Sequence, residues 1–277
     1  MRQTTTADGR PIPVIGQGTW QMGQAKKRRP DEVAAIRLGL DLGMSLIDTA
    51  EMYGSGRAEE IVAEAIAGRR DDVFIVTKVL PENASKRRMP RALERSLARL
   101  KVECVDLYLL HWESEHPMEE ILDSFVKLRD AGKIRSFGVS NIDVPLLTKT
   151  RALPGGDAIA ADQVLYNPMR RGIERKLLGL CRDSGMLVMA YSPLEQGRLD
   201  LGGVFKEIAA ERGVAPSTVA LAWAVRHAGV VAVPKAVKLE HVRANAAAGD
   251  FVLDAAELAR IDEAYPAPTR DVPLAVI

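Results

Sequence analysis

The chain has 277 residues, of which 47% are hydrophobic and 27% are charged, with a net charge of +1. This composition is typical of a folded globular protein, and the length suffices for one α/β barrel or two smaller domains. Because Lys and Arg are interspersed with Asp and Glu along the chain, the charge distribution does not favour nucleic acid as a partner. The basic cluster Lys26–Arg29 precedes Pro30-Asp31-Glu32 and is interpreted as a solvated loop.

The cysteines and the apolar runs indicate a cytoplasmic protein. Cys104 and Cys181 lie in separate units among apolar neighbours, which favours free thiols in a reducing compartment. The polar stretch Arg2–Arg10 is unlike a signal peptide. No apolar run reaches the roughly 18 residues that a membrane span needs. We therefore expect a cytoplasmic monomer without a membrane or nucleic-acid partner.

Strand and helix patterns alternate along the chain after a short hairpin at the Asp8-Gly9 turn. The predicted strands are apolar on consecutive residues, as in strands buried on both faces. They span residues 15–18, 45–48, 73–78, 105–111, 133–139, 158–163, 186–190 and 230–233. The predicted helices end at glycine or begin after proline or a capping residue. They span residues 31–42, 58–67, 90–100, 118–130, 144–150, 174–184, 204–212, 217–227, 240–248 and 255–264.

Eight strands, each followed by a helix and with no linker between units, predict one domain over residues 1–277. The predicted fold is a (β/α)8 TIM barrel with an N-terminal β-hairpin and additional C-terminal helices. A doubly wound sheet is the alternative. However, no Gly-x-Gly-x-x-Gly follows a strand, since Gly16-Gln17-Gly18 lacks the third glycine.

Polar groups stand at the C-terminal ends of the predicted strands, which a barrel brings together on one face. They are Asp48, Lys78, His111, Ser140, Asn141, Gln163, Tyr191, Ser192 and Lys235. Each alone has a structural interpretation, because a strand-end aspartate usually caps a turn and a strand-end lysine is usually solvated. Their convergence on one face favours a functional site.

Three of these residues, together with Tyr53, which follows Asp48 by five positions, suit the reduction of a carbonyl group. A tyrosine with its ordinary pKa of about 10 is a poor acid at neutral pH, and a nearby ammonium lowers that pKa. We expect Tyr53 to donate a proton, assisted by Lys78, with Asp48 holding the lysine charged. A neutral His111 would orient the carbonyl, and hydride would come from a cofactor.

Eight motifs in order resemble the aldo-keto reductases over essentially the whole chain. They are Gly18-Thr19-Trp20, Ile47-Asp48-Thr49-Ala50-x-x-Tyr53-Gly54, Thr77-Lys78, Asp106-Leu107-Tyr108-Leu109-Leu110-His111-Trp112, Gly138-Val139-Ser140-Asn141, Gln163-x-x-Tyr166-Asn167 and Ala190–Leu194, followed by Val233-Pro234-Lys235. The resemblance implies an NADPH-dependent oxidoreductase whose catalytic tetrad is Asp48, Tyr53, Lys78 and His111.

The resemblance also implies a set of cofactor-binding residues. Ser140, Asn141 and Gln163 would hold the nicotinamide carboxamide, and Tyr191 would stack on the nicotinamide ring. The complete implied set is Gly18, Thr19, Trp20, Asp48, Ser140, Asn141, Gln163, Tyr191, Ser192, Pro193, Leu194, Lys235, Ala236, His241 and Asn245.

The last family motif, Pro-Lys-Ser-x-x-x-x-Arg-x-x-Glu-Asn, is only partly present. Lys235 and Asn245 match it, whereas Ala236, His241 and Ala244 stand where the family has Ser, Arg and Glu.

Other cations of this segment could still meet a 2′-phosphate, because Lys238 and Arg243 lie near Lys235 in the chain. We therefore expect NADPH as the cofactor, with NADH as the alternative.

Two tryptophans follow strand ends and indicate a partly apolar substrate pocket. With Tyr53 and His111, Trp20 and Trp112 are the predicted substrate-binding residues, which suits an aldehyde or a small ketone. Segments near both ends resemble bacterial reductases of methylglyoxal and similar aldehydes, so 2-oxoaldehydes are one expected substrate class. These segments are Gln17-Gly18-Thr19-Trp20 and Ala264-Tyr265-Pro266-Ala267-Pro268.

Two other functions compete with this interpretation. One is a non-catalytic NADPH-binding regulatory barrel like the potassium-channel β-subunits, against which the intact tetrad argues. The other is a metal-dependent hydrolase using His111, Glu113, Glu115 and His116. All four of those ligands would come from one loop, which is unlike known metal sites.

Overall fold

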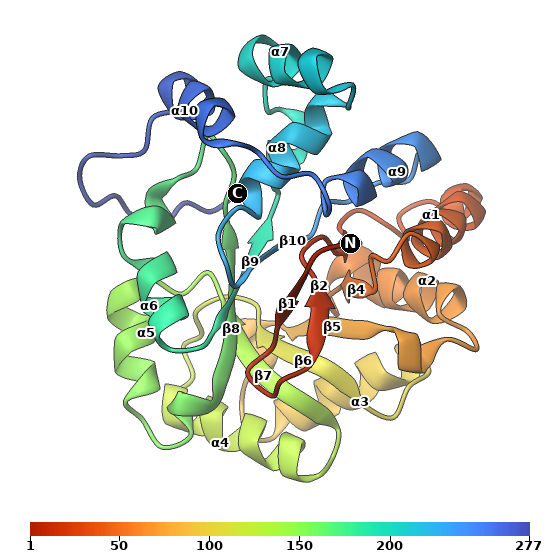
Figure 1. The fold of residues 1–277 in the computed structure, drawn as a ribbon. Helices are drawn as coiled ribbons and strands as arrows, with labels where there is room; N and C mark the ends of the chain where they lie inside the picture. Colours follow the sequence, from red (N-terminus) through yellow and green to blue (C-terminus); the bar gives the residue numbers. More distant parts are fainter.

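In a computed structural model that describes all 277 residues, eight parallel strands follow one another around a barrel (Figure 1). Each strand pairs with the next along the chain, in the order β3 to β10. The strands are β3 (Gln17–Gly18), β4 (Leu46–Asp48), β5 (Phe74–Val79), β6 (Val105–Leu110), β7 (Ile134–Ser140), β8 (Ile159–Leu165), β9 (Leu187–Tyr191) and β10 (Val230–Ala232).

The first and last strands meet and close the sheet. Ile15 and Ala232 form a parallel bridge, and the Gly16 amide donates to the Ala232 carbonyl at 2.8 Å. One step further, the Gly18 amide donates to the Pro234 carbonyl at 3.0 Å. Closure therefore brings the segment after β3 beside the segment after β10.

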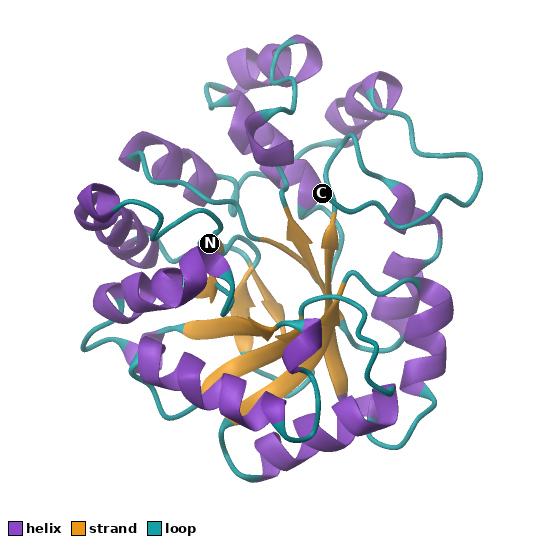
Figure 2. Cartoon of the chain, turned by 180° about the vertical axis from the view of Figure 1, so that it is seen from behind, coloured by secondary structure: helices purple, strands orange, loops and turns teal.

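Ten α-helices surround the strands, as Figure 2 shows from the opposite side. They are α1 (Arg29–Asp41), α2 (Arg57–Ala65), α3 (Arg88–Leu100), α4 (Met118–Asp130), α5 (Val144–Arg151), α6 (Leu177–Asp183), α7 (Gly203–Arg212), α8 (Pro216–Ala224), α9 (Leu239–Ala247) and α10 (Ala255–Ala264). The predicted (β/α)8 barrel with extra C-terminal helices is confirmed. None of these helices is long and apolar enough to cross a membrane.

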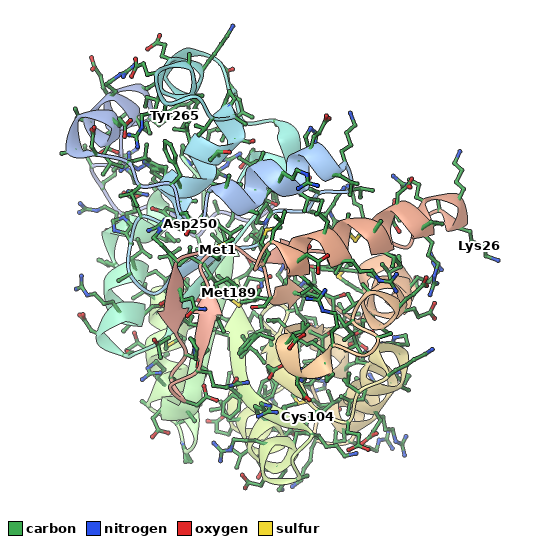
Figure 3. All side chains as sticks on the ribbon, turned by 45° about the vertical axis from the view of Figure 1, so that its right-hand side comes forward. Met1, Lys26, Cys104, Met189, Asp250 and Tyr265 are labelled. Carbon is green, nitrogen blue, oxygen red and sulfur yellow. The ribbon has the colours of Figure 1, made fainter.

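The predicted hairpin is present and covers the N-terminal end of the barrel. Its strands, β1 (Gln3–Thr5) and β2 (Pro11–Pro13), pair antiparallel and bring Ile12 against the inward-facing residues Leu46 and Phe74. Arg10, in the turn between β1 and β2, pairs with the buried Asp106 at 2.6 Å. The N-terminal ammonium is held by Asp250 at 2.8 Å (Figure 3). This end of the barrel is therefore filled and braced.

The barrel strands are buried on both faces, as their apolar sequences predict. One apolar cluster fills the barrel interior, and a larger one lies between strands and helices. Two predicted helices differ from the structure. The predicted helix 174–184 is interrupted at Lys176 (φ −142°), because Glu174 is fixed by bonds from Arg171, Arg226 and Tyr166. The predicted helix 217–227 ends at Ala224.

Candidate active site

The C-terminal ends of β4 and β5 place Asp48 and Lys78 next to each other inside the barrel. Asp48 is the last residue of β4, and Lys78 is one residue from the end of β5. Parallel pairing of these strands sets their relative height, since Asp48 lies opposite Val76. His111 immediately follows β6, where its amide donates to the Val79 carbonyl at 3.0 Å.

Lys78 is the centre of the hydrogen-bond network. Its ammonium is fully buried and donates to both carboxylate oxygens of Asp48 at 2.8 and 2.9 Å. It also donates to the Thr49 carbonyl at 2.8 Å and lies 3.2 Å from the Tyr53 hydroxyl. A buried ammonium is destabilising unless its donors are satisfied. The arrangement meets that condition and aims the positive charge at Tyr53.

A left-handed turn brings Tyr53 back over the strand ends. Tyr53 opens the short 3-10 helix η2 (Tyr53–Gly56), in which Gly54, Ser55 and Gly56 all have positive φ. A side chain at position 54 would lie 2.8 Å from the Met22 carbonyl oxygen, so only glycine fits there. The turn therefore fixes the tyrosine ring against the lysine.

The pKa of Tyr53 differs from the sequence-based expectation. Burial raises it well above the ordinary value, and the negative charge of Asp48 raises it further. The predicted lowering by Lys78 is absent, because burial and the negative charge of Asp48 both favour the neutral hydroxyl. Tyr53 is accordingly protonated throughout the physiological range.

His111 is an uncharged imidazole in this site. Burial, with the nearby charge of Lys78, lowers its pKa to about 2. Its ring stacks on Trp112 with a centroid distance of 3.9 Å and lies edge-on to Tyr53 at 5.7 Å. Its Nδ1 atom is buried without a hydrogen-bond partner. A neutral imidazole has one N–H, so His111 can donate one hydrogen bond to a ligand.

Side chains from β7, β8 and β9 continue the network around the barrel. The Gln163 amide donates to Asp48 Oδ1 at 2.7 Å, and the Ser140 hydroxyl donates to the Gln163 carbonyl at 2.8 Å. The Tyr191 hydroxyl donates to Asn141 Oδ1 at 2.9 Å. These residues, predicted from the strand ends, thus form one connected chain with the Asp48–Lys78 pair.

The loop after β9 is held in a constrained backbone shape. Ser192 and Glu195 both have positive φ, near 50°. The Asn167 amide donates to the Ser192 carbonyl at 3.0 Å and to the buried Glu195 carboxylate at 2.6 Å, and Arg170 pairs with the same carboxylate at 2.8 Å. The bonds from Asn167 and Arg170 therefore fix the segment that includes Pro193 and Leu194. The bracing role of Asn167 was not predicted, although this residue belongs to the motif Gln163-x-x-Tyr166-Asn167.

Residues of the last motif lie beside the barrel closure. Ala236 and Asn245 line a small pocket with Gly18, next to the end of β10. Lys235 is exposed, and so is His241, whose side chain is 61% exposed on α9 and lies 3.7 Å from Glu240. His241 is therefore at the outer edge of this region.

The two predicted substrate tryptophans lie at the mouth of the site. Trp20 is 39% exposed and makes an edge contact with Tyr53 at 5.0 Å between centroids. Trp112 is half-buried and covers one face of His111. Neither belongs to the apolar core, so the structural interpretation of these residues does not apply.

Glu51 supports the site but has no distinct signal in the sequence. Its buried carboxylate accepts from the Leu80 amide at 2.8 Å and from Asn83 at 3.0 Å, which ties the loop after β4 to the loop after β5. Elsewhere, His, Cys, Asp and Glu side chains do not gather in any group of three or more suited to a metal ion.

Known proteins are similar to this chain in sequence and fold. A family model described as "Aldo/keto reductase family" matches residues 14–266. The methylglyoxal reductase YeaE of Escherichia coli is 48% identical over 262 residues, which cover 93% of this chain and 92% of that protein. Two solved structures of an aldo-keto reductase from Klebsiella pneumoniae align with this chain over 100% of its length and 100% of their own. One, in complex with NADP and acetate, has a TM-score of 0.97 at 44% identity, and the other, in complex with NADPH, has 0.96 at 45%.

Proposed function

Because the chain belongs to the aldo/keto reductase family, we propose that it reduces 2-oxoaldehydes such as methylglyoxal to alcohols with NADPH, using Tyr53 as the proton donor. The relative from Escherichia coli supports the substrate class by its name, and the Klebsiella structures support the cofactor. The tetrad geometry supports the role of Tyr53.

The residues present fit such a cofactor. The Tyr191 ring and the Asn141 side chain lie together at one end of the site. At the other end Lys235 is an exposed cation that forms no ion pair within the chain, which suits an anionic phosphate. When bound there, a reduced nicotinamide supplies hydride to the carbonyl carbon.

Tyr53 is suited to give its proton to the carbonyl oxygen as negative charge develops there. Its raised pKa keeps the hydroxyl protonated until that moment. The Lys78 ammonium at 3.2 Å then stabilises the phenolate oxygen that the proton leaves behind. The lysine therefore acts on the charged state that forms during the reaction, rather than by ionising the free tyrosine.

Asp48 keeps that ammonium charged and in place. Burial lowers the pKa of Lys78, and the carboxylate of Asp48 opposes this effect. Gln163 donates to the same carboxylate and fixes its orientation. Asp48 is thus a positioning residue, because it acts through Lys78.

His111 and the tryptophans would orient the substrate. The neutral imidazole donates a hydrogen bond to the carbonyl oxygen, and stacking on Trp112 holds its ring. Trp20 and Trp112 supply an apolar wall for a small aldehyde. All four tetrad residues come from one chain, so we also propose that the protein works as a cytoplasmic monomer.

The observation that carries this proposal is the contact of one buried ammonium with both Asp48 and Tyr53. The test is to mix the purified chain with methylglyoxal and NADPH and to follow NADPH consumption by absorbance, with NADH in parallel. We expect turnover with NADPH. Tight NADPH binding without turnover of methylglyoxal or any simple aldehyde would contradict the proposal and favour the regulatory alternative.

A further inference from the structure

A fully buried carboxylate lies in the helix that follows the Tyr53 turn. Glu59 is the third residue of α2, which begins directly after that turn. The helices α2 and α3 are neighbours around the barrel, and α3 packs on β5, the strand that carries Lys78 (Figure 1). Burying a carboxylate is unfavourable unless its oxygens are satisfied. The partners of Glu59 therefore show which elements it holds together.

The two oxygens of Glu59 bond to two different elements. Oε1 accepts from the Thr77 hydroxyl of β5 at 2.7 Å, and Oε2 accepts from Arg99 Nε of α3 at 2.6 Å. Thr77 is fully buried and directly precedes Lys78. Because neighbouring residues of a strand point to opposite faces, Lys78 points into the barrel and Thr77 points toward the helices. Glu59 therefore ties α2 to the part of β5 that carries Lys78.

The Arg99 side chain also supports the turn that carries Tyr53. It lies against Gly56, since a Cβ atom at position 56 would be 2.5 Å from Arg99 Nε. Gly56 is the last residue of η2 and the N-cap of α2, and its φ of 89° is one that glycine adopts without strain. Glu59 holds Arg99 in place, so it also supports the end of the turn.

The charge of Glu59 acts on the same lysine. Burial lowers the pKa of Lys78, whereas the negative charge of Asp48 and, less strongly, that of Glu59 raise it. Asp48 bonds to the ammonium directly, while Glu59 reaches β5 through Thr77. The contacts and the charge of Glu59 thus both favour a charged Lys78 held at 3.2 Å from the Tyr53 hydroxyl.

We propose that Glu59 is a positioning residue for the reduction, which acts through Thr77 and Arg99 to hold the Tyr53 turn against the strand that carries Lys78. This inference rests on the proposed function. Tyr53 and Lys78 belong to different elements, and the ammonium stabilises the phenolate oxygen only when the two are in contact. A displacement of about 1 Å in such a site can lower the rate by about 10²-fold.

Substitutions of Thr77 separate this role from packing. Thr77→Val keeps the shape of the side chain but removes the hydroxyl that bonds to Glu59, whereas Thr77→Ser keeps the hydroxyl and removes a methyl group. A third variant, Glu59→Gln, keeps the shape and removes the charge. Its matched control is Glu257→Gln, because Glu257 is also buried and pairs with Arg212 at 2.6 Å, between α7 and α10.

The measurement is the rate of a single turnover of NADPH with methylglyoxal, followed by stopped-flow absorbance, since this rate excludes product release. We expect Thr77→Val and Glu59→Gln to lower it by about tenfold or more. NADPH affinity, measured by fluorescence titration, should stay within about twofold, because the lost contact acts on the reaction and not on cofactor binding. Thr77→Ser and Glu257→Gln should keep the single-turnover rate within about twofold, although urea unfolding should show that both are less stable.

Two results would overturn the inference and leave the proposed function intact. One is an unmodified chain that reduces methylglyoxal together with a Thr77→Val variant that is as fast as Thr77→Ser. The other is an equal loss of rate and of NADPH affinity in Thr77→Val, which would indicate a general distortion of the site. If Glu59→Gln does not fold, the two Thr77 variants decide the question. If the unmodified chain reduces neither methylglyoxal nor any simple aldehyde, the proposed function fails, and this inference fails with it.

Discussion

Charged side chains have partners in the tetrad pocket but lack them at the rim, the exposed surface where α1 and α9 begin. In the pocket, Lys78 is fully buried and bonded to Asp48 through both oxygens. At the rim, Arg28 is exposed and has no acidic partner. A buried charge needs a partner from the chain itself, whereas an exposed charge is stabilised by water and stays available to a ligand. The charges of Asp48 and Lys78 are thus paired in the absence of a ligand, whereas the charge of Arg28 is not.

This comparison explains why the pocket and the rim should respond differently to substitution. We expect changes inside the pocket to alter catalysis or stability, because the buried charges of Asp48 and Lys78 are each other's partners. We expect changes at the rim, where the side chains are exposed, to leave the bonds of the pocket intact.

Tyr53→Phe should give the largest effect. It removes the proton source but keeps the ring, which packs against Trp20 and His111. We expect kcat for methylglyoxal to fall by about 10²–10⁴-fold, the usual contribution of a positioned acid. NADPH binding, followed by fluorescence titration, should stay within about twofold. A variant with near-normal kcat would show that another group supplies the proton.

Lys78→Met should lower kcat by about 10²-fold and also destabilise the fold. The substitution leaves Asp48 buried without its cation, which typically costs about 3–5 kcal/mol of unfolding free energy. Urea unfolding measures this loss. The control is the double variant Lys78→Met with Asp48→Asn, which should recover part of the stability without recovering activity. Recovery of both would contradict a role for the ammonium in the reaction.

The barrel could be predicted from the sequence, because its strands are continuously apolar and its helices have clear start and stop residues. The order of β4, β5 and β6 then placed Asp48, Lys78 and His111 on neighbouring strand ends, where the structure brings them together. Their chemical roles stay predictions. The prediction that the Tyr53 pKa is lowered was wrong, because burial and the pairing of Lys78 depend on three-dimensional contacts.

The rim was harder to predict for a related reason. Arg28 and Lys235 are 207 positions apart, and only closure of the barrel brings α1 and α9, which these two residues precede, side by side. The break at Lys176 likewise follows from the contacts of Glu174 with Arg226, which lie in different units.

Asp162 offers a direct test of the rule that a buried charge needs a partner. It lies on β8 next to Gln163, is fully buried and has no cation or side-chain donor, and the nearby Ile142 backbone amide is too poorly placed to offset burial. Burial raises its pKa to about 8. Between pH of about 4 and 8 the folded chain therefore holds a proton that the unfolded chain has lost, so this group makes stability fall as pH rises through that window.

Asp162→Asn removes this titration. We expect the variant to gain stability relative to the unmodified chain as pH rises from 4 to 8, by about 1–3 kcal/mol at pH 8. Urea unfolding of both proteins at pH 5 and pH 8 measures the difference. A constant difference between the two pH values would show that Asp162 does not titrate in this range.

His241→Arg should have the smallest effect and act only on the cofactor. The side chain is 61% exposed on α9, so an arginine there should not disturb packing. A guanidinium is always charged and suits phosphate better than an imidazole does. We expect KM for NADPH to fall about threefold to tenfold, as one exposed charge contact allows. NADH, which lacks the 2′-phosphate, is the internal control. An equal fall in KM for both cofactors would indicate general attraction rather than recognition of the 2′-phosphate, and would move the phosphate site away from α9.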